Sequence, residues 1–148
     1  MKPLKVAIVS NGERMTDATL WHNGSHPITP KLIVESLSDA KAEIDYSNYD
    51  CNNLNRLREI LYRYVTSHNI PPDGFTLTPE QRESDADLWH NGFHPITPEH
   101  MIDSLASAKD ALSSSNYDME NLDRVKEILL RYCEENNIPR GNAIQPVH

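Results

Sequence analysis

The stretch LWHNGSHPITP at residues 20–30 returns as LWHNGFHPITP at residues 88–98, and this recurrence decides how the whole chain is interpreted. The offset of 68 residues holds without a gap from position 17 to position 71, where 31 of 55 residues are identical to their mates, the residues 68 positions further on. Self-similarity at a fixed period points to a repeat architecture. We therefore expect a tandem duplication, with repeats at residues 1–71 and 72–148.

The two repeats are expected to fold together. Each has about the size at which a lone hydrophobic core is only marginally stable. The junction PPDGFTLTP at residues 71–79 indicates a turn followed by a short extended segment, and it lacks the composition of a flexible linker. We predict a single domain over residues 1–148, in which the repeats pack about a pseudo-twofold axis.

Two amphipathic helices are predicted in each repeat. The first begins at Thr29-Pro30 and again at Thr97-Pro98, because threonine caps free N–H groups and proline fits the first helical position. Apolar residues at three- and four-residue spacing predict its buried face. These residues are Ile33, Leu37, Ala40 and Ile44, with the mates Met101, Leu105, Ala108 and Leu112.

The second helix of each repeat is expected to start at an aspartate cap, which is Asp50 in the first repeat and Asp118 in the second. It would end at an asparagine in the left-handed conformation, before a proline that prevents continuation. This asparagine is Asn69 in the first repeat and Asn137 in the second. Its apolar face is formed by Leu54, Leu57, Ile60, Leu61 and Tyr64, with the mates Leu122, Val125, Ile128, Leu129 and Tyr132.

Short strands are predicted at VAIV (residues 6–9), at FTL (75–77) and at NAIQ (142–145). Together with the helices they give a mainly helical α+β fold. The expected unit is strand–loop–helix–helix, present twice, with four main helices.

The block at residues 20–30 repeats more faithfully than the rest, with ten of eleven positions identical against 21 of the other 44. One interpretation is structural. Asn-Gly favours a turn, Trp21 and Trp89 would be buried anchors, and Ile28 and Ile96 would pack back on the helix start as a hydrophobic staple. The histidines would then hydrogen-bond carbonyl groups of the loop.

The other interpretation is a ligand site, because aromatic and hydrogen-bonding side chains are dense in this block. Tryptophan would stack on a base, histidine and asparagine would read its polar edge, and the N–H groups at the helix start would hold a phosphate or carboxylate. Imidazoles gathered by a twofold axis would bind a transition metal, but no thiol or carboxylate follows at ligand spacing, so neither a metal site nor a cofactor is predicted. The candidate ligand-binding residues are Trp21, His22, Asn23 and His26, with Trp89, His90, Asn91 and His94.

Three further residues of the second helix recur with their charges. Arg56, Glu59 and Arg63 place glutamate four residues before arginine, the favourable order for a helical ion pair. We expect a solvated helix face here, with a partner-binding stripe as the alternative. The arginines of that stripe are Arg56, Arg63, Arg124 and Arg131.

Composition limits the functional classes. The net charge is −8, which argues against a protein that neutralises nucleic-acid phosphates, although mimicry of DNA remains open. Neither a signal peptide nor an apolar run of transmembrane length is evident. Cys51 and Cys133 each align with an apolar mate, which indicates core residues of a cytoplasmic protein. The motifs of nucleophilic, metal-dependent and nucleotide-cradling enzymes are missing.

These observations predict a small, acidic, cytoplasmic binding protein without catalysis, which acts on a macromolecular partner as an inhibitor or adaptor of the kind carried by phages and mobile elements. A protein is the expected partner, and self-association stays open. The alternative is a protein that binds or sequesters a small molecule or nucleotide with the two Trp-His-Asn-Gly-x-His loops. A metal-dependent or acid–base enzyme is a further alternative.

Overall fold

The computed structural model describes residues 14–139, and this part of the chain is mainly helical with two small antiparallel hairpins. No described helix combines the length and the apolarity needed to cross a membrane. The elements are α1 (Asp17–Leu20), β1 (His22–Asn23), β2 (His26–Pro27), α2 (Pro30–Glu43), α3 (Asn48–Ser67), η2 (Pro79–Gln81), α4 (Asp85–Leu88), β3 (His90–Asn91), β4 (His94–Pro95), α5 (Pro98–Ala111) and α6 (Asn116–Asn136).

Each element from α1 to α3 has a counterpart that begins 68 residues later, from α4 to α6. Each half therefore contains a short helix, a hairpin and two long helices, so the two long helices agree with the prediction and the second half does not begin with the predicted strand. Residues 75–77 form no strand: Phe75 is buried in the core, but its backbone pairs with no neighbouring strand. The strands predicted at residues 6–9 and 142–145 lie outside the described residues.

The starts of the helices confirm one predicted cap and correct the other. Thr29 caps α2 by accepting a hydrogen bond from the N–H of Leu32, and Pro30 is the first helical residue. The cap of α3 is Ser47, which accepts from the N–H of Asp50 at 3.2 Å, so the predicted cap Asp50 lies inside the first turn. Ser115 and Asp118 repeat this arrangement in α6. The serine wins because it stands three residues before an N–H that needs an acceptor.

The helix ends follow the prediction. Asn69 and Asn137 have φ values of 57° and 58°, in the left-handed region that asparagine tolerates better than most residues. The chain then leaves the helix at the prolines that follow.

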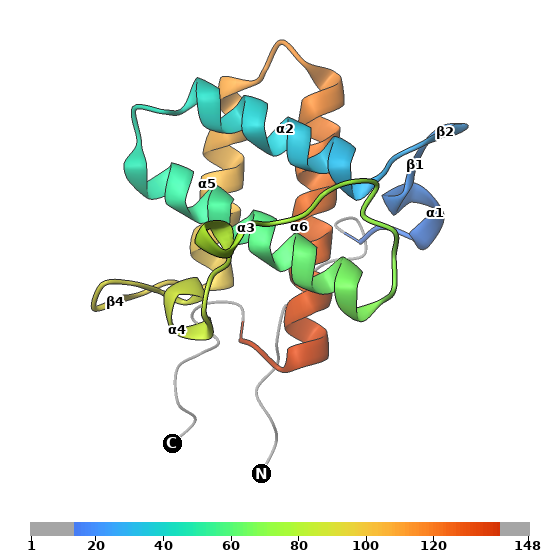
Figure 1. Ribbon diagram of the computed structural model, residues 1–148. Helices are drawn as coiled ribbons and strands as arrows, with labels where there is room; N and C mark the ends of the chain where they lie inside the picture. Colours follow the sequence, from blue (N-terminus) through green and yellow to red (C-terminus); the bar gives the residue numbers. More distant parts are fainter. Residues whose placement is uncertain (1–13, 140–148) are drawn as a thin grey trace.

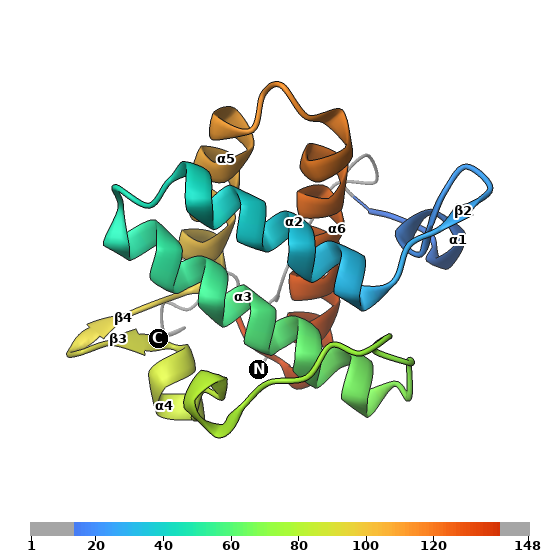
Figure 2. The same cartoon turned by 45° about the horizontal axis from the view of Figure 1, so that its top comes forward.

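The core lies between the four long helices, with α2 packed on α6 and α3 packed on α5 across the two halves (Figures 1 and 2). Both predicted apolar faces are buried, apart from Tyr132, which is half-buried. The two hairpins lie on opposite sides of this helical core, as both views show.

The buried polar residues have an unusual distribution. Eight polar or charged residues of the described chain are buried, and they form four pairs of identical mates. Buried polar groups are expensive unless they are hydrogen-bonded. Within the described residues every buried side-chain nitrogen or oxygen has a partner. The pairs are Ser36/Ser104, Asn53/Asn121, Arg56/Arg124 and Glu59/Glu127.

Candidate functional site

In each hairpin a turn forms where the sequence indicates one, but its two loop residues begin at the glycine, and the asparagine before it belongs to the strand. Asn23 pairs with His26 in the register of β1 and β2, which leaves Gly24 and Ser25 as the two loop residues. Gly24 has a φ of +65°, the conformation that a glycine at the first loop position of a tight hairpin supplies without strain. Gly92 has a φ of +66° in the other hairpin, where Phe93 takes the place of Ser25.

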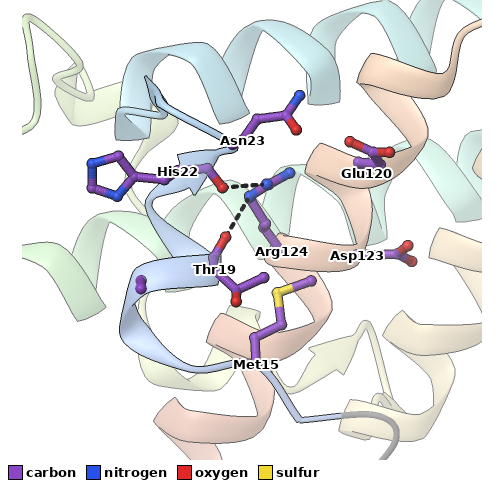
Figure 3. A pocket seen from close by; sticks show the side chains of 9 residues that line it. Met15, Thr19, His22, Asn23, Glu120, Asp123 and Arg124 are labelled. Carbon is purple, nitrogen blue, oxygen red and sulfur yellow. Dashed lines mark hydrogen bonds between the residues drawn. The ribbon is translucent and has the colours of Figure 1, made fainter.

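A buried arginine from the opposite half holds the base of each hairpin. Arg124, on α6, donates from Nε to the carbonyl oxygen of Leu20 at 3.0 Å and from a terminal nitrogen to that of His22 at 2.8 Å. Figure 3 shows its guanidinium turned toward the backbone of α1 and β1. Arg56, on α3, makes similar bonds in the other half: Nε donates to the carbonyl of Asp87 in α4, the mate of Thr19, at 3.0 Å, and a terminal nitrogen donates to that of His90 at 2.7 Å.

A chain of hydrogen bonds extends from each of these arginines into the core. Arg124 donates to Asn121 at 3.1 Å, and Asn121 donates to Ser36 on α2 at 2.9 Å. Ser36 in turn donates to Asp118 at 2.7 Å, which returns the chain to the first turn of α6. The mates form an equivalent chain that starts in the other half. Arg56 donates to Asn53, Asn53 donates to Ser104, and Ser104 donates to Asp50. The position of each hairpin is thus coupled to the packing of the two halves.

A second pair of polar clusters fixes the segments that precede the hairpins. The carboxylate of Glu59 is fully buried and accepts from Arg63 at 2.7 Å and from Arg82 at 2.8 Å. Arg63 also binds Asp85, next to the second hairpin, at 2.6 Å. Burial alone would raise the pKa of Glu59, but the hydrogen bonds from Arg82 and Arg63 outweigh it and hold the pKa of this carboxyl below its ordinary value.

The mates repeat this cluster around Glu127, which binds Arg131 at 2.7 Å and Arg14 at 2.7 Å. Arg131 reaches Asp17, before the first hairpin, at 2.6 Å. Arg14 and Arg82 are themselves mates, and the sequence reasoning missed both. Extending the 68-residue alignment upstream of residue 17 would have shown that an arginine stands at the same position in both halves.

The predicted solvated face on the second helix was therefore wrong. The predicted ion pair with i,i+4 spacing exists, but Arg56 and Arg124 are only 7% and 4% exposed. Arg63 and Arg131 are half-buried and have acceptors within the chain. All four arginines of the proposed partner-binding stripe are engaged in holding the hairpins.

The side chains at the tips of the hairpins are exposed, whereas the arginines that hold their bases are buried. The side chains of His22, Asn23 and His26 are exposed, and so are those of their mates His90, Asn91 and His94. His90 donates from Nδ1 to the carbonyl of Ala86 at 3.2 Å, as the structural interpretation expects. The imidazole of His22 points away from Arg124 (Figure 3).

The two groups of histidines are not brought together, because the hairpins lie on opposite sides of the molecule (Figure 1). Within residues 14–139 no cluster of histidine, cysteine and carboxylate side chains has the geometry of a metal site. Trp21 and Trp89 are half-buried against the edge of the core, so they anchor the hairpins with part of the indole only.

A pocket of about 460 Å³ lies between the first hairpin and α6, beside His22 and Asn23 (Figure 3). Its floor includes the backbone-bound Arg124, and its α6 wall carries the carboxylates of Glu120 and Asp123. The mates of these two residues are Asn52 and Asn55, so the second half does not repeat the charge of the pocket. Carboxylates at this wall oppose the binding of a phosphate or an organic acid.

The cysteines behave as the sequence suggests. Cys133 is fully buried, and burial raises the pKa of its thiol to about 12. Cys51 is half-buried, with its sulfur near the carbonyls of Lys41 and Ile44.

Comparison of the chain with protein-family models, curated proteins and solved structures finds no significant match. The function has to be inferred from the geometry of this chain alone.

Proposed function

We propose that this chain is a binding protein that presents its two hairpin tips to a protein partner and acts on it as an inhibitor or adaptor, without catalysis. One observation carries the proposal. The exposed tip residues His22, Asn23 and His26 are identical to their mates, although solvent exposure relieves them of any packing constraint. Exposed surface positions usually tolerate substitution with little effect on stability.

The bases of the hairpins support this proposal. A binding surface on a rigid support loses less conformational entropy when a partner docks. Each hairpin is held by a buried arginine with charge-assisted hydrogen bonds, and that arginine is fixed by a polar chain through the core. Two tips held in this way on opposite sides of the molecule are suited to contact two partner sites or two partner molecules.

Small-molecule binding is the second candidate, and the pocket beside His22 and Asn23 favours it. The carboxylate of Glu120 indicates a cationic ligand rather than a nucleotide, whereas that of Asp123 is bound to Lys109 at 2.5 Å. Native mass spectrometry of the purified chain tests this candidate, because a retained ligand adds mass that disappears on denaturation. A bare polypeptide mass after addition of polyamines would contradict it.

We also propose that the chain arose by tandem duplication, folds as one domain of two repeats, and works in the cytoplasm. The hydrogen bonds between the halves support the duplication and the single domain, since each hairpin is held by an arginine of the other half in an equivalent way. Expression of residues 1–71 alone tests the second, and an independently folded half would contradict it.

The main experiment compares proteins captured by the wild type with those captured by a tip variant that carries alanine at positions 22, 23, 26, 90, 91 and 94. We expect the tip variant to lose at least about tenfold of the partner signal, as removal of several contact residues does. The control is Glu35→Ala with Asp103→Ala, because these mates are also exposed but lie on α2 and α5. Equal capture by the tip variant, or no specific capture by the wild type, would overturn the proposal.

A further inference from the structure

The two hairpins differ at one tip residue, and the difference is large in chemical terms. Phe93 occupies the second loop position of the β3–β4 hairpin and is 99% exposed, whereas its mate is Ser25. The hairpin projects away from the long helices (Figure 2), so this ring contacts none of them. A fully exposed phenyl ring would gain free energy if a complementary apolar surface covered it.

A complementary surface is present on the same half of the molecule. A slot of about 290 Å³ lies between α5 and α6. A cavity of about 150 Å³ already accepts a benzene ring, so this slot has room for a phenyl group. The sulfur of Met119 favours contact with an aromatic ring. The apolar lining is formed by Ile102, Leu105, Ala106, Met119 and Leu122.

Three residues that line the slot are larger or more apolar than their mates in the first half. Ile102 stands where its mate is Val34, and Ala106 where its mate is Ser38. Met119 likewise replaces the smaller Cys51. The half that carries the exposed phenylalanine is thus also the half in which these three lining positions hold larger or more apolar residues.

The charges around the slot are suited to a second copy of the chain. The rim has two lysines, Lys109 and Lys126, and two aspartates, Asp110 and Asp123, so its formal charge is zero. Two chains of net charge −8 repel each other, and a neutral rim reduces this repulsion at the point of contact. The side chains beside Phe93 on the hairpin are the histidines at positions 90 and 94, which add no negative charge.

We propose that the chain associates with itself by inserting Phe93 of one copy into the α5–α6 slot of another. Each copy has one such ring and one such slot, so the contact gives a closed pair when it is reciprocal and an open chain when it is not. This inference does not depend on the proposed binding function, because it uses neither the identity of the tip residues between the halves nor a foreign partner.

Sedimentation velocity over a wide concentration range tests the proposal. The wild type is expected to show an average mass above 16.9 kDa that rises with concentration. Phe93→Ser, which installs the residue of the other tip, should weaken association roughly thirtyfold, as removal of an aromatic anchor does. A wild type that stays monomeric at every concentration, or that associates equally well after Phe93→Ser, would overturn the proposal.

The slot has its own variant and matched control. Ala106→Glu places a carboxylate at the mouth of the slot on an exposed helix position and should abolish association. Ser38→Glu makes the equivalent change on α2 and should leave association unchanged. Circular dichroism of each variant verifies the fold. Association that survives Ala106→Glu, or is lost equally after Ser38→Glu, would overturn the assignment of the slot.

A mixing experiment gives the sharpest result. Phe93→Ser retains the slot and Ala106→Glu retains the ring, so each variant should be monomeric alone. Mixed, they should form a complex with one copy of each, because one intact ring meets one intact slot. Failure of the mixture to form this complex, when the wild type associates, would overturn the insertion of Phe93 into the slot.

Discussion

The buried arginine at the base of each hairpin and the histidines and asparagine at its tip are identical between the two halves, but their surroundings differ. At the base, Arg56 and Arg124 are buried and bind carbonyl groups of the opposite half. Any substitution there leaves unpaired groups in the interior, which explains why the residues match. At the tip, the histidines and asparagines are exposed, and packing does not require a particular residue. Identity between mates therefore has a structural explanation at the base, and at the tip the proposed binding function supplies the explanation.

The largest effect is expected at the buried carboxylates. Glu59→Ala removes the acceptor shared by Arg63 and Arg82 and leaves both guanidinium groups poorly paired beside the core. Breaking a buried ion pair on one side costs about 3–5 kcal/mol. Urea denaturation should show this loss for Glu59→Ala and for its mate Glu127→Ala. Glu80→Ala, at an exposed position on η2, is the control and should change the free energy of unfolding little.

A loss below 1 kcal/mol in both glutamate variants would mean that the base is not held by these clusters. The structural explanation for the identical residues at the base would then fail.

The next effect is at the arginines. Arg124→Ala removes the donors to the carbonyls of Leu20 and His22 and should cost about 3 kcal/mol. The structural consequence should be local to the hairpin of the other half. Hydrogen exchange at the N–H of Ile28, which donates to Trp21 at 2.7 Å, should accelerate, while that of Ile96 stays protected. The variant Arg56→Ala should give the reverse pattern, and equal acceleration at both hairpins would contradict the assignment.

How much of this arrangement follows from the sequence depends on the range of the interactions. Helix starts such as Thr29-Pro30 and the apolar faces are local patterns, and the structure confirms them. The hairpins cannot be distinguished from loops in the sequence, because each strand has only two residues, too few for an alternating pattern to be recognised.

The buried arginines could not be predicted from local patterns. Along the helix, Arg56, Glu59 and Arg63 have the spacing of a solvated face. Their burial follows from the packing of α3 and α6 beside the hairpins of opposite halves, which no local pattern encodes. The structure places the candidate tip residues of each half on one hairpin, but the separation of the two sets on opposite sides of the molecule depends on this same packing.

A smaller loss is expected at the half-buried tryptophans. Trp21→Ala and Trp89→Ala each remove an indole that covers the edge of the core. Full truncation of a buried aromatic residue costs about 3–5 kcal/mol, and a half-buried one should cost about 2 kcal/mol. Thermal unfolding of both variants measures this. A cost near zero would mean that the tryptophans are free to bind a ligand, which would revive their interpretation as stacking residues.

Acidification of the wild type should cause part of the stability loss expected for Glu59→Ala. Because the pKa of Glu59 is below its ordinary value in the folded protein, its contribution to stability is complete above the unfolded pKa of roughly 4.3. This contribution is lost as the pH falls through the lower folded pKa. Urea denaturation between neutral and acidic pH should therefore show a declining free energy of unfolding. The decline should be shallower in Glu59→Gln, and an identical decline would exclude Glu59 as its source.

The smallest effect on stability is expected at the tips. This measurement decides whether the tip is part of the scaffold, as the base is. His22→Ala and His90→Ala remove exposed imidazoles, so the free energy of unfolding should change by less than about 0.5 kcal/mol. His90→Ala also removes a hydrogen bond to Ala86 and serves as the more demanding case. If both variants unfold as the wild type does, their identity across the halves is not explained by stability, and loss of partner capture in the same variants identifies its cause. If either histidine costs as much as Arg124, the tip belongs to the scaffold like the base, and the argument for a binding surface fails.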